Sequence, residues 1–343
     1  MLMIWLPHRS ASRPVLLLAA MLFCGATARS QQIQPGLSGS AGGQEGGIDA
    51  SHSTDPLLHD QEALVTQGRY ADAERSITAY LSSHADSADA HFLLGYVLYR
   101  EDQPQRSLAE YTLAAHFRRP AANDLAVVAM DYILLSDYRD ADTWLTKATT
   151  WSPETALYWY YLGRTKYNEN RFQEAIDAFK RCFVLYPRDV RAEYNLGLAY
   201  AGLNRNEEAA AAYETAIAWQ SGAAQQDPQP DLDYGILLLQ GGDTDKALLH
   251  LERAVSLDGR NPRAHEQLGR TYDKLHKLAE AEAEMSKALS LAPSVSSLHF
   301  EMGRIYQREG KAEKAKQEFA RCAALNATHS TDTTETPNPD PRK

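Results

Sequence analysis

The sequence has 343 residues, 44% of them hydrophobic, and its formal net charge is −10 at pH 7. An acidic chain repels the phosphates of nucleic acids and of anionic lipids, so we expect neither as its main partner. The apolar content is ordinary for a globular protein, so a buried core is feasible.

Residues 1–28 have the three parts of a signal peptide. Arg9 and Arg13 supply positive charge, residues 15–23 form an apolar run, and residues 26–28 (Ala-Thr-Ala) match an A-x-A cleavage site. The apolar run is shorter than the roughly 20 residues that span a bilayer. We therefore expect an exported protein, periplasmic or secreted, with no membrane insertion after cleavage. The alternative is that the segment remains as an N-terminal membrane anchor.

Residues 29–53 are rich in glutamine, glycine and serine. Such a segment buries too little apolar surface to offset the entropy of ordering it, so it is predicted to be a disordered linker. Residues 330–343 are rich in proline and threonine and are predicted to be a disordered tail. The folded part is thus expected over residues 54–329.

The stretch 156–189 predicts a pair of helices. Offsets of three and four residues place its apolar residues on one face of each helix. These residues are Trp159, Leu162 and Gly163, then Ala175, Ile176, Phe179 and Cys182, ending before Pro187. Small residues at Gly163 and Ala175 allow the two helices to approach closely. The remaining apolar side is too large for one pair to bury alone.

The same pattern recurs every 34 residues. A small residue at position eight of each unit is followed by a second small residue at position 20 and a large apolar one at position 24. In chain order these are Gly95/Ser107/Tyr111, Ala129/Ala141/Leu145, Gly163/Ala175/Phe179, Gly197/Ala209/Tyr213, Gly235/Ala247/Leu251, Gly269/Ala281/Met285 and Gly303/Ala315/Phe319. A degenerate unit precedes them. Four inserted residues, 224–227, make the junction between the fifth and sixth units the expected irregularity or hinge.

With these residues the chain resembles the tetratricopeptide repeat (TPR) family. Trp159, Leu162, Gly163, Ala175, Phe179 and Pro187 meet its W-x2-L-G-x2-Y…A-x3-F…P pattern, and Lys166 departs from it at the tyrosine position. The resemblance implies an all-α superhelical solenoid of about eight helix-turn-helix repeats. The units are expected to begin at 54, 88, 122, 156, 190, 228, 262 and 296.

In that family a concave groove is lined by the first helix of each unit. The resemblance places the groove-facing side chains at positions 2, 5, 9, 12 and 13, which are aromatic in the first half of this array and basic in the second. The candidates for binding a partner are Phe92, Tyr96, Tyr99, Met130, Tyr160, Arg164, Tyr167, Tyr194, Arg263, Arg270, Lys274, Arg304 and Arg308. Ile133 and Asn168 occupy such positions too.

A groove of this kind suits an extended peptide or a partner protein. Tyrosines would supply contact area at little cost in entropy, and arginines would bind carboxylates through two hydrogen bonds. The alternative interpretation is structural. The tyrosines would then pad the inner wall, and the arginines would pair with Glu266 and Asp273.

No sequence motif for catalysis or cofactor binding is present. The chain contains no H-E-x-x-H, C-x-x-C, phosphate-binding loop or nucleophile elbow. His91, His265 and His299 recur at position four of their units, which favours packing between helices over metal binding. We therefore expect no enzyme activity, no cofactor and no metal.

Two further groups of residues have plain structural interpretations. Asp227, Asp231 and Asp233 lack the spacing of a calcium loop, so a solvated turn is expected. Cys182 and Cys322 share position 27 in units four repeats apart, so both are expected to be buried and too distant for a disulfide.

The sequence therefore predicts a non-enzymatic scaffold in the cell envelope that binds a peptide or partner protein in its groove. The alternative function is a dedicated chaperone or adaptor subunit of a secretion or polysaccharide-export machine.

Overall fold

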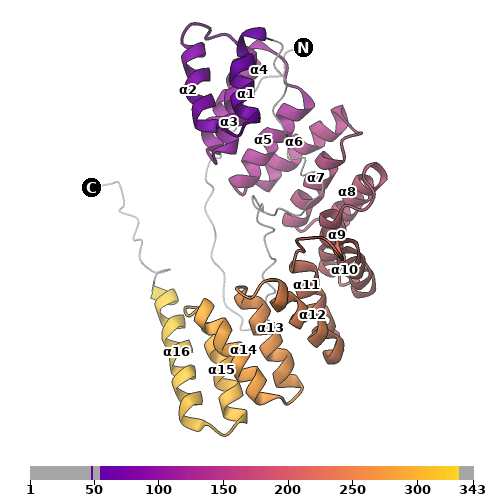
Figure 1. Cartoon of the computed structure of the whole chain (residues 1–343), viewed down its shortest axis with the longest axis vertical. Helices are drawn as coiled ribbons and strands as arrows, with labels where there is room; N and C mark the ends of the chain where they lie inside the picture. Colours follow the sequence, from indigo (N-terminus) through magenta and orange to yellow (C-terminus); the bar gives the residue numbers. More distant parts are fainter. Residues whose placement is uncertain (1–47, 49–54, 332–343) are drawn as a thin grey trace, which may run out of the picture. The chain divides into compact units, whose positions relative to one another are not determined.

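The computed structural model describes Ile48 and residues 55–331. Within them the chain forms one 3-10 helix, η1 (Pro56–Leu58), and sixteen α-helices, with no β-strand (Figure 1). The predicted signal peptide (1–28), the predicted linker apart from Ile48, and residues 332–343 of the predicted tail lie outside the described residues.

The helices form eight consecutive pairs, and each helix also packs on the next one in the chain. This confirms the predicted all-α solenoid of helix pairs. The pairs are α1 (His59–Thr66) with α2 (Tyr70–Leu81), α3 (Ala88–Arg100) with α4 (Pro104–Phe117), α5 (Ala122–Leu134) with α6 (Tyr138–Trp151), α7 (Ala156–Asn168) with α8 (Phe172–Leu185), α9 (Val190–Gly202) with α10 (Asn206–Gln220), α11 (Gln229–Gly241) with α12 (Thr244–Leu257), α13 (Pro262–Lys274) with α14 (Leu278–Leu291), and α15 (Ser296–Arg308) with α16 (Ala312–Thr331).

The turn inside each pair contains one residue with positive φ. These residues are Gly68, Asp102, Ser136, Asn170, Asn204, Gly242, His276 and Gly310, with φ between 58° and 87°. In the fourth pair, the amide of Arg171 then donates to the carbonyl of Lys166 at 2.9 Å, which closes the end of α7. The turn residues recur every 34 positions except between Asn204 and Gly242, where the four inserted residues lie.

Within a pair, the large side chain at position 24 lies directly on the small residue at position eight. A Cβ atom added to Gly163 would sit 2.6 Å from Cε1 of Phe179, and one added to Gly197 would sit 2.6 Å from Cε1 of Tyr213. Phe179 is fully buried at 0% exposure. Glycine is therefore required here because the ring of the second helix fills the space that a side chain would need.

The core consists of four separate hydrophobic clusters, spread along the array. Each cluster joins neighbouring pairs, as expected when every repeat contacts only the repeats beside it.

The last helix ends later than predicted. Helix α16 has 20 residues and continues to Thr331, past residue 329, where the array was expected to end. No proline or glycine occurs between Gly310 and Pro337, so nothing in the local sequence stops the helix at 329.

Candidate partner-binding face

The odd-numbered helices from α3 to α15 carry all thirteen candidate residues. We call their common surface the first-helix face. Along it α3 contacts α5, α7 contacts α9, and α13 contacts both α11 and α15. Candidate residues from different repeats are therefore brought onto one surface.

On α3, two of the aromatic candidates are packed into the wall of the first-helix face. Phe92 and Tyr96 are each 3% exposed. The guanidinium of Arg118 lies 4.6 Å from the centre of the Phe92 ring, and Arg100 donates a hydrogen bond of 2.8 Å to the Tyr96 hydroxyl. Tyr99 is only partly exposed, and burial raises its pKa. These rings shape the surface more than they protrude from it.

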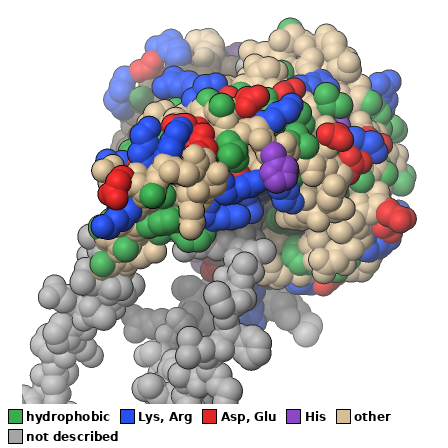
Figure 2. All heavy atoms as spheres, turned by 90° about the horizontal axis from the view of Figure 1, so that it is seen from below, with side chains coloured by type: hydrophobic (Ala, Val, Ile, Leu, Met, Phe, Trp, Pro, Cys, Tyr) green, Lys and Arg blue, Asp and Glu red, His purple; other side chains and the backbone are tan. Residues whose placement is uncertain are grey.

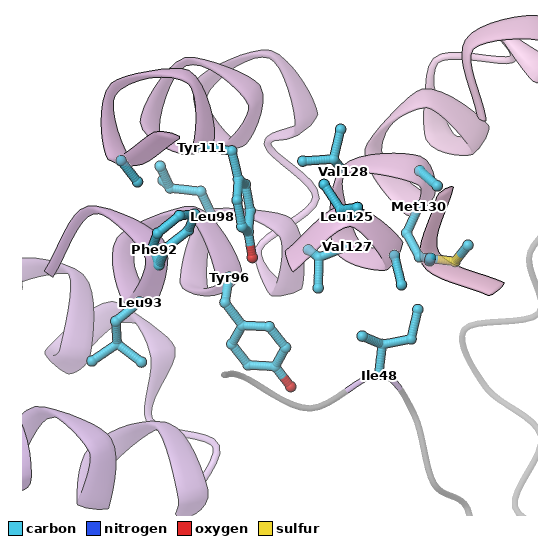
Figure 3. Packing of buried hydrophobic residues seen from close by; sticks show 14 of the residues in the cluster. Ile48, Phe92, Leu93, Tyr96, Leu98, Tyr111, Leu125, Val127, Val128 and Met130 are labelled. Carbon is cyan, nitrogen blue, oxygen red and sulfur yellow. The ribbon is translucent and has the colours of Figure 1, made fainter. Parts of the chain in front are cut away.

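Ile48, from the segment before the array, is buried on this part of the face. Its side chain is 4% exposed and belongs to the same hydrophobic cluster as Tyr96, Ala126 and Met130. Figure 3 shows its side chain below Val127 and Met130 and pointing toward α5, with the Tyr96 ring to its left. We call this place the Ile48 seat. Sequence reasoning missed it because Ile48 lies outside the repeats.

Beside the seat lies a small hollow between α5 and α7, about 20 Å³ in volume and partly open to solvent. It is lined by Met130, Ile133, Tyr161, Arg164, Thr165 and Asn168. Four of these six occupy the positions at which the sequence predicted groove-facing residues. The hydroxyl of Thr165 is buried and has no hydrogen-bond partner among the described residues. The hollow thus combines apolar walls with polar groups.

The candidates on α7 and α9 are buried or bound to other side chains. Tyr160 is 5% exposed, with the Arg191 guanidinium 5.0 Å from its ring centre. Tyr167 is 9% exposed. The Tyr194 hydroxyl donates to Asp233 at 2.6 Å, and burial together with that carboxylate raises the Tyr194 pKa. These tyrosines link α7, α9 and α11 to one another.

The candidate cations of the second half have acidic or carbonyl partners, as the structural alternative expected. The pairs are Arg263 with Asp233 at 3.1 Å, Arg270 with Glu266 at 3.9 Å, Arg304 with Glu301 at 3.0 Å, Arg308 with Asp273, and Lys274 with the Leu239 carbonyl at 3.0 Å. Figure 2 shows lysines and arginines interspersed with acidic side chains on the visible face. The positive charge here is therefore largely balanced, which favours the α5–α7 region as the binding site.

The histidines at position four join the two helices of their pairs. Nδ1 of each lies 2.6 Å from a glutamate nineteen residues later, and Nε2 lies near a carbonyl six residues earlier. The pairs are His91 with Glu110, His265 with Glu284, and His299 with Glu318. Trp159, at the same position, donates to the Pro153 carbonyl at 2.8 Å in the same way. The constant offset of nineteen residues was visible in the sequence and would have identified the glutamates.

The expected solvated turn of aspartates is wrong for two of the three residues. Asp231 and Asp233 lie on α11 and are 0% and 7% exposed. Asp231 pairs with His250 at 2.8 Å, while Asp233 accepts from Tyr194. Both carboxylates hold helices together. Asp231, at position four, faces the second helix of its own pair, whereas Asp233, at position six, contacts α9 of the preceding pair. No group of three or more metal-ligating side chains occurs within the described residues.

The insertion is fixed to the helix before it. The side-chain amide of Gln220, at the end of α10, donates to the Asp227 carbonyl and accepts from the Asp227 amide, both at 2.9 Å. The junction that the sequence marked as a hinge is therefore closed by a pair of hydrogen bonds.

The two cysteines among the described residues differ in burial. Cys182 is 1% exposed, and burial raises its pKa to about 12. Cys322 is partly exposed, contrary to expectation, because no further helix pair follows α16 among the described residues. Both thiols are free.

Comparison with known proteins agrees with this architecture. Family models described as "Tetratricopeptide repeat" match residues 62–124, 129–182, 160–228, 238–294 and 296–329. A peroxisomal targeting signal receptor of Candida albicans is 41% identical over 58 residues, which is 17% of this chain and 10% of the receptor. The chain thus spans a small part of that curated relative.

Two solved structures share the fold. The structure of the APC/C hetero-tetramer Cut9-Hcn1 matches with a TM-score of 0.55 and 18% identity, covering 80% of this chain and 53% of that one. The structure of PilW, a type IV pilus biogenesis factor, matches with a TM-score of 0.54 and 22% identity, covering 59% and 92%. In the part of the chain that the structure describes, no helix has the length and apolar character needed to cross a bilayer.

Proposed function

Since the chain belongs to the tetratricopeptide repeat family, we propose that it is a non-catalytic scaffold that binds an extended segment of a partner protein across α5 and α7. The fold supports protein–protein interaction as the general role. The specific site is our proposal, and the hollow beside Met130 carries it. This hollow is open to solvent on the face where residues of two consecutive first helices converge.

The chemistry of the hollow indicates what it would bind. Met130, Ile133 and Tyr161 offer apolar contact to a side chain of the partner. Arg164 would add a charge-assisted hydrogen bond to a carbonyl or carboxylate. An extended peptide presents backbone and side-chain groups of these kinds in alternation.

We also propose that the protein works outside the cytoplasm, in the periplasm or after secretion. The support is the leader-like sequence of residues 1–28, with its two arginines, apolar run and A-x-A site. In a fractionated native host, the mature protein would start near residue 29. Recovery of the full-length chain with intact residues 1–28 in the cytoplasm would refute export.

A photo-crosslinking experiment in the native host tests the binding site. A photoreactive phenylalanine analogue replaces Asn168 at the hollow, and in a matched control it replaces Val184 on α8, which is 72% exposed. We expect a crosslinked partner from position 168 and none from position 184. Crosslinks from position 184 alone would place the binding site on the second helices instead.

The pattern of crosslinked proteins distinguishes a general scaffold from the alternative function. Several partners at position 168 favour the scaffold, whereas one partner in constant stoichiometry favours a dedicated chaperone or adaptor of a secretion or export machine. PilW shares only the fold at 22% identity and does not decide between them.

A further inference from the structure

We propose that the Ile48 seat is a docking site for one branched aliphatic side chain of an extended segment, and that the chain's own Ile48 fills it in competition with a partner. This inference rests on the proposed function, because the competing partner is the one expected in the adjoining hollow.

Ile48 is buried although it lies outside the repeats. Ile48 is 4% exposed, as deeply buried as Tyr96 and Met130 of the same cluster, at 3% and 5%. Ile48 is the only large aliphatic residue between Leu37 and Leu57, within a stretch of glycine, serine and polar residues. In the stretch between Leu37 and Leu57, only the Ile48 side chain thus has enough apolar surface to hold the stretch on the array.

The Ile48 seat and the hollow share one residue, Met130. Met130 belongs to the cluster that buries Ile48 and also lines the hollow between α5 and α7. Figure 3 shows Met130 on the side of α5 toward which Ile48 points. A peptide that extended from the hollow across Met130 would therefore reach the place that Ile48 occupies.

The short connection between Ile48 and the array makes Ile48 an effective competitor of a free peptide. Residues 49–54 connect Ile48 to Asp55, where the described array begins. A connection of seven residues reaches at most about 25 Å, so the side chain stays close to its seat. A ligand held by so short a connection acts at an effective concentration in the millimolar range. A weak contact by Ile48 is then sufficient to reduce the apparent affinity of a free peptide.

The chemistry of the segment defines the ligand class. Ile48 follows Gly46-Gly47 and precedes Asp49-Ala50, so its neighbours are small or acidic. The best-matched external ligand is an extended peptide with one isoleucine or valine flanked by small residues. A labelled synthetic peptide of sequence Gly-Gly-Ile-Asp-Ala is the direct probe.

The first measurement uses the methyl resonances of full-length protein labelled at methionine. In Ile48→Asp we expect the Met130 methyl resonance to shift, while those of Met285 and Met302, far along the chain, stay in place. Leu37→Asp, a change of the same kind in the same linker, is the control and should shift none of the three. An unchanged Met130 resonance in Ile48→Asp overturns the inference.

The second measurement is the affinity of the labelled peptide. We expect Ile48→Asp to bind it about 10-fold or more tightly than the wild-type chain and the Leu37→Asp control. Equal affinities, or no binding to Ile48→Asp, would overturn the competition. A crosslinked partner that binds wild type and Ile48→Asp equally would overturn this inference while leaving the proposed function intact.

Discussion

Nδ1 of His250 lies 2.8 Å from a carboxylate oxygen of Asp231, so the sixth repeat reverses the order of acid and imidazole found in the next pair, His265 with Glu284. Positions four and 23 of a repeat face each other across the helix pair. In either order the imidazole has a carboxylate partner. In the second, sixth, seventh and eighth repeats the pairing of an acid with an imidazole is thus kept, although the residue at either position can change.

The reversal predicts a specific rescue. Asp231→His alone places two imidazoles together and should lower the free energy of unfolding by about 1–3 kcal/mol. Asp231→His combined with His250→Glu recreates the order of the seventh repeat and should recover most of that loss. Urea unfolding of Asp231→His, of His250→Glu and of the double variant measures the coupling. If the loss of unfolding free energy in the double variant equals the sum of the losses in the two single variants, the two positions are not coupled.

The contact between Gly163 and Phe179 predicts a cost for one methyl group. Gly163→Ala places a Cβ 2.6 Å from the Phe179 ring and should reduce stability by about 1–3 kcal/mol. Gly241→Ala is the matched control, because a Cβ there meets no atom within 4 Å. Thermal unfolding of both variants should show a loss for the first only. A neutral Gly163→Ala would mean that the two helices are farther apart than described.

Asp131 predicts a pH dependence. Burial raises its pKa to about 8, although the hydroxyl of Ser107 donates to it at 2.5 Å and opposes that shift. In the unfolded chain the pKa is about 3.9, so between those values the folded state holds a proton that the unfolded state has released. Stability from this group is therefore complete below about pH 4 and falls by up to about 1.4 kcal/mol per pH unit up to pH 8.

Asp131→Asn removes this titration. Unfolding free energies at pH 5 and pH 7 should show the variant gaining on the wild type by up to about 3 kcal/mol over those two units. Glu193, whose burial raises its pKa to about 7, remains in both proteins and cancels in the comparison. An equal difference between variant and wild type at both pH values would contradict a protonated Asp131.

The cysteines should react in order of exposure. Cys182 is 1% exposed and its pKa is raised by burial, so its thiol should stay unmodified in the native chain. Cys322 is partly exposed and should be alkylated. Mass mapping after brief treatment with iodoacetamide, with and without urea, reads both sites. Modification of Cys182 without urea would show that the fourth repeat opens under native conditions.

The repeat period alone was enough to predict the fold. A period of 34 residues places Gly163 beneath Phe179 and the turn residue Asn170 between the two helices. Each repeat packs its two helices through the same positions. The same register placed Met130 and Arg164 on one surface. Local periodicity is sufficient for features that every repeat shares.

Contacts between repeats could not be predicted in this way. Arg106 reaches Glu74, 32 residues earlier, and Tyr194 reaches Asp233 across the insertion. These contacts depend on the side chains of two particular repeats rather than on the shared pattern. Ile48 was missed for a related reason. The surface that buries it is formed by α3 and α5, and no residue close to Ile48 in the sequence indicates that contact.

The affinity of the partner captured at position 168 for Arg164→Glu tests the central proposal most directly. Reversing the charge at the hollow between α5 and α7 should weaken binding about 10-fold or more, while the same charge reversal in Arg304→Glu on α15 should leave it unchanged. Isothermal titration of the purified partner with wild type and both variants gives the three constants. Full affinity in Arg164→Glu, or an equal loss in both variants, would contradict binding at this hollow.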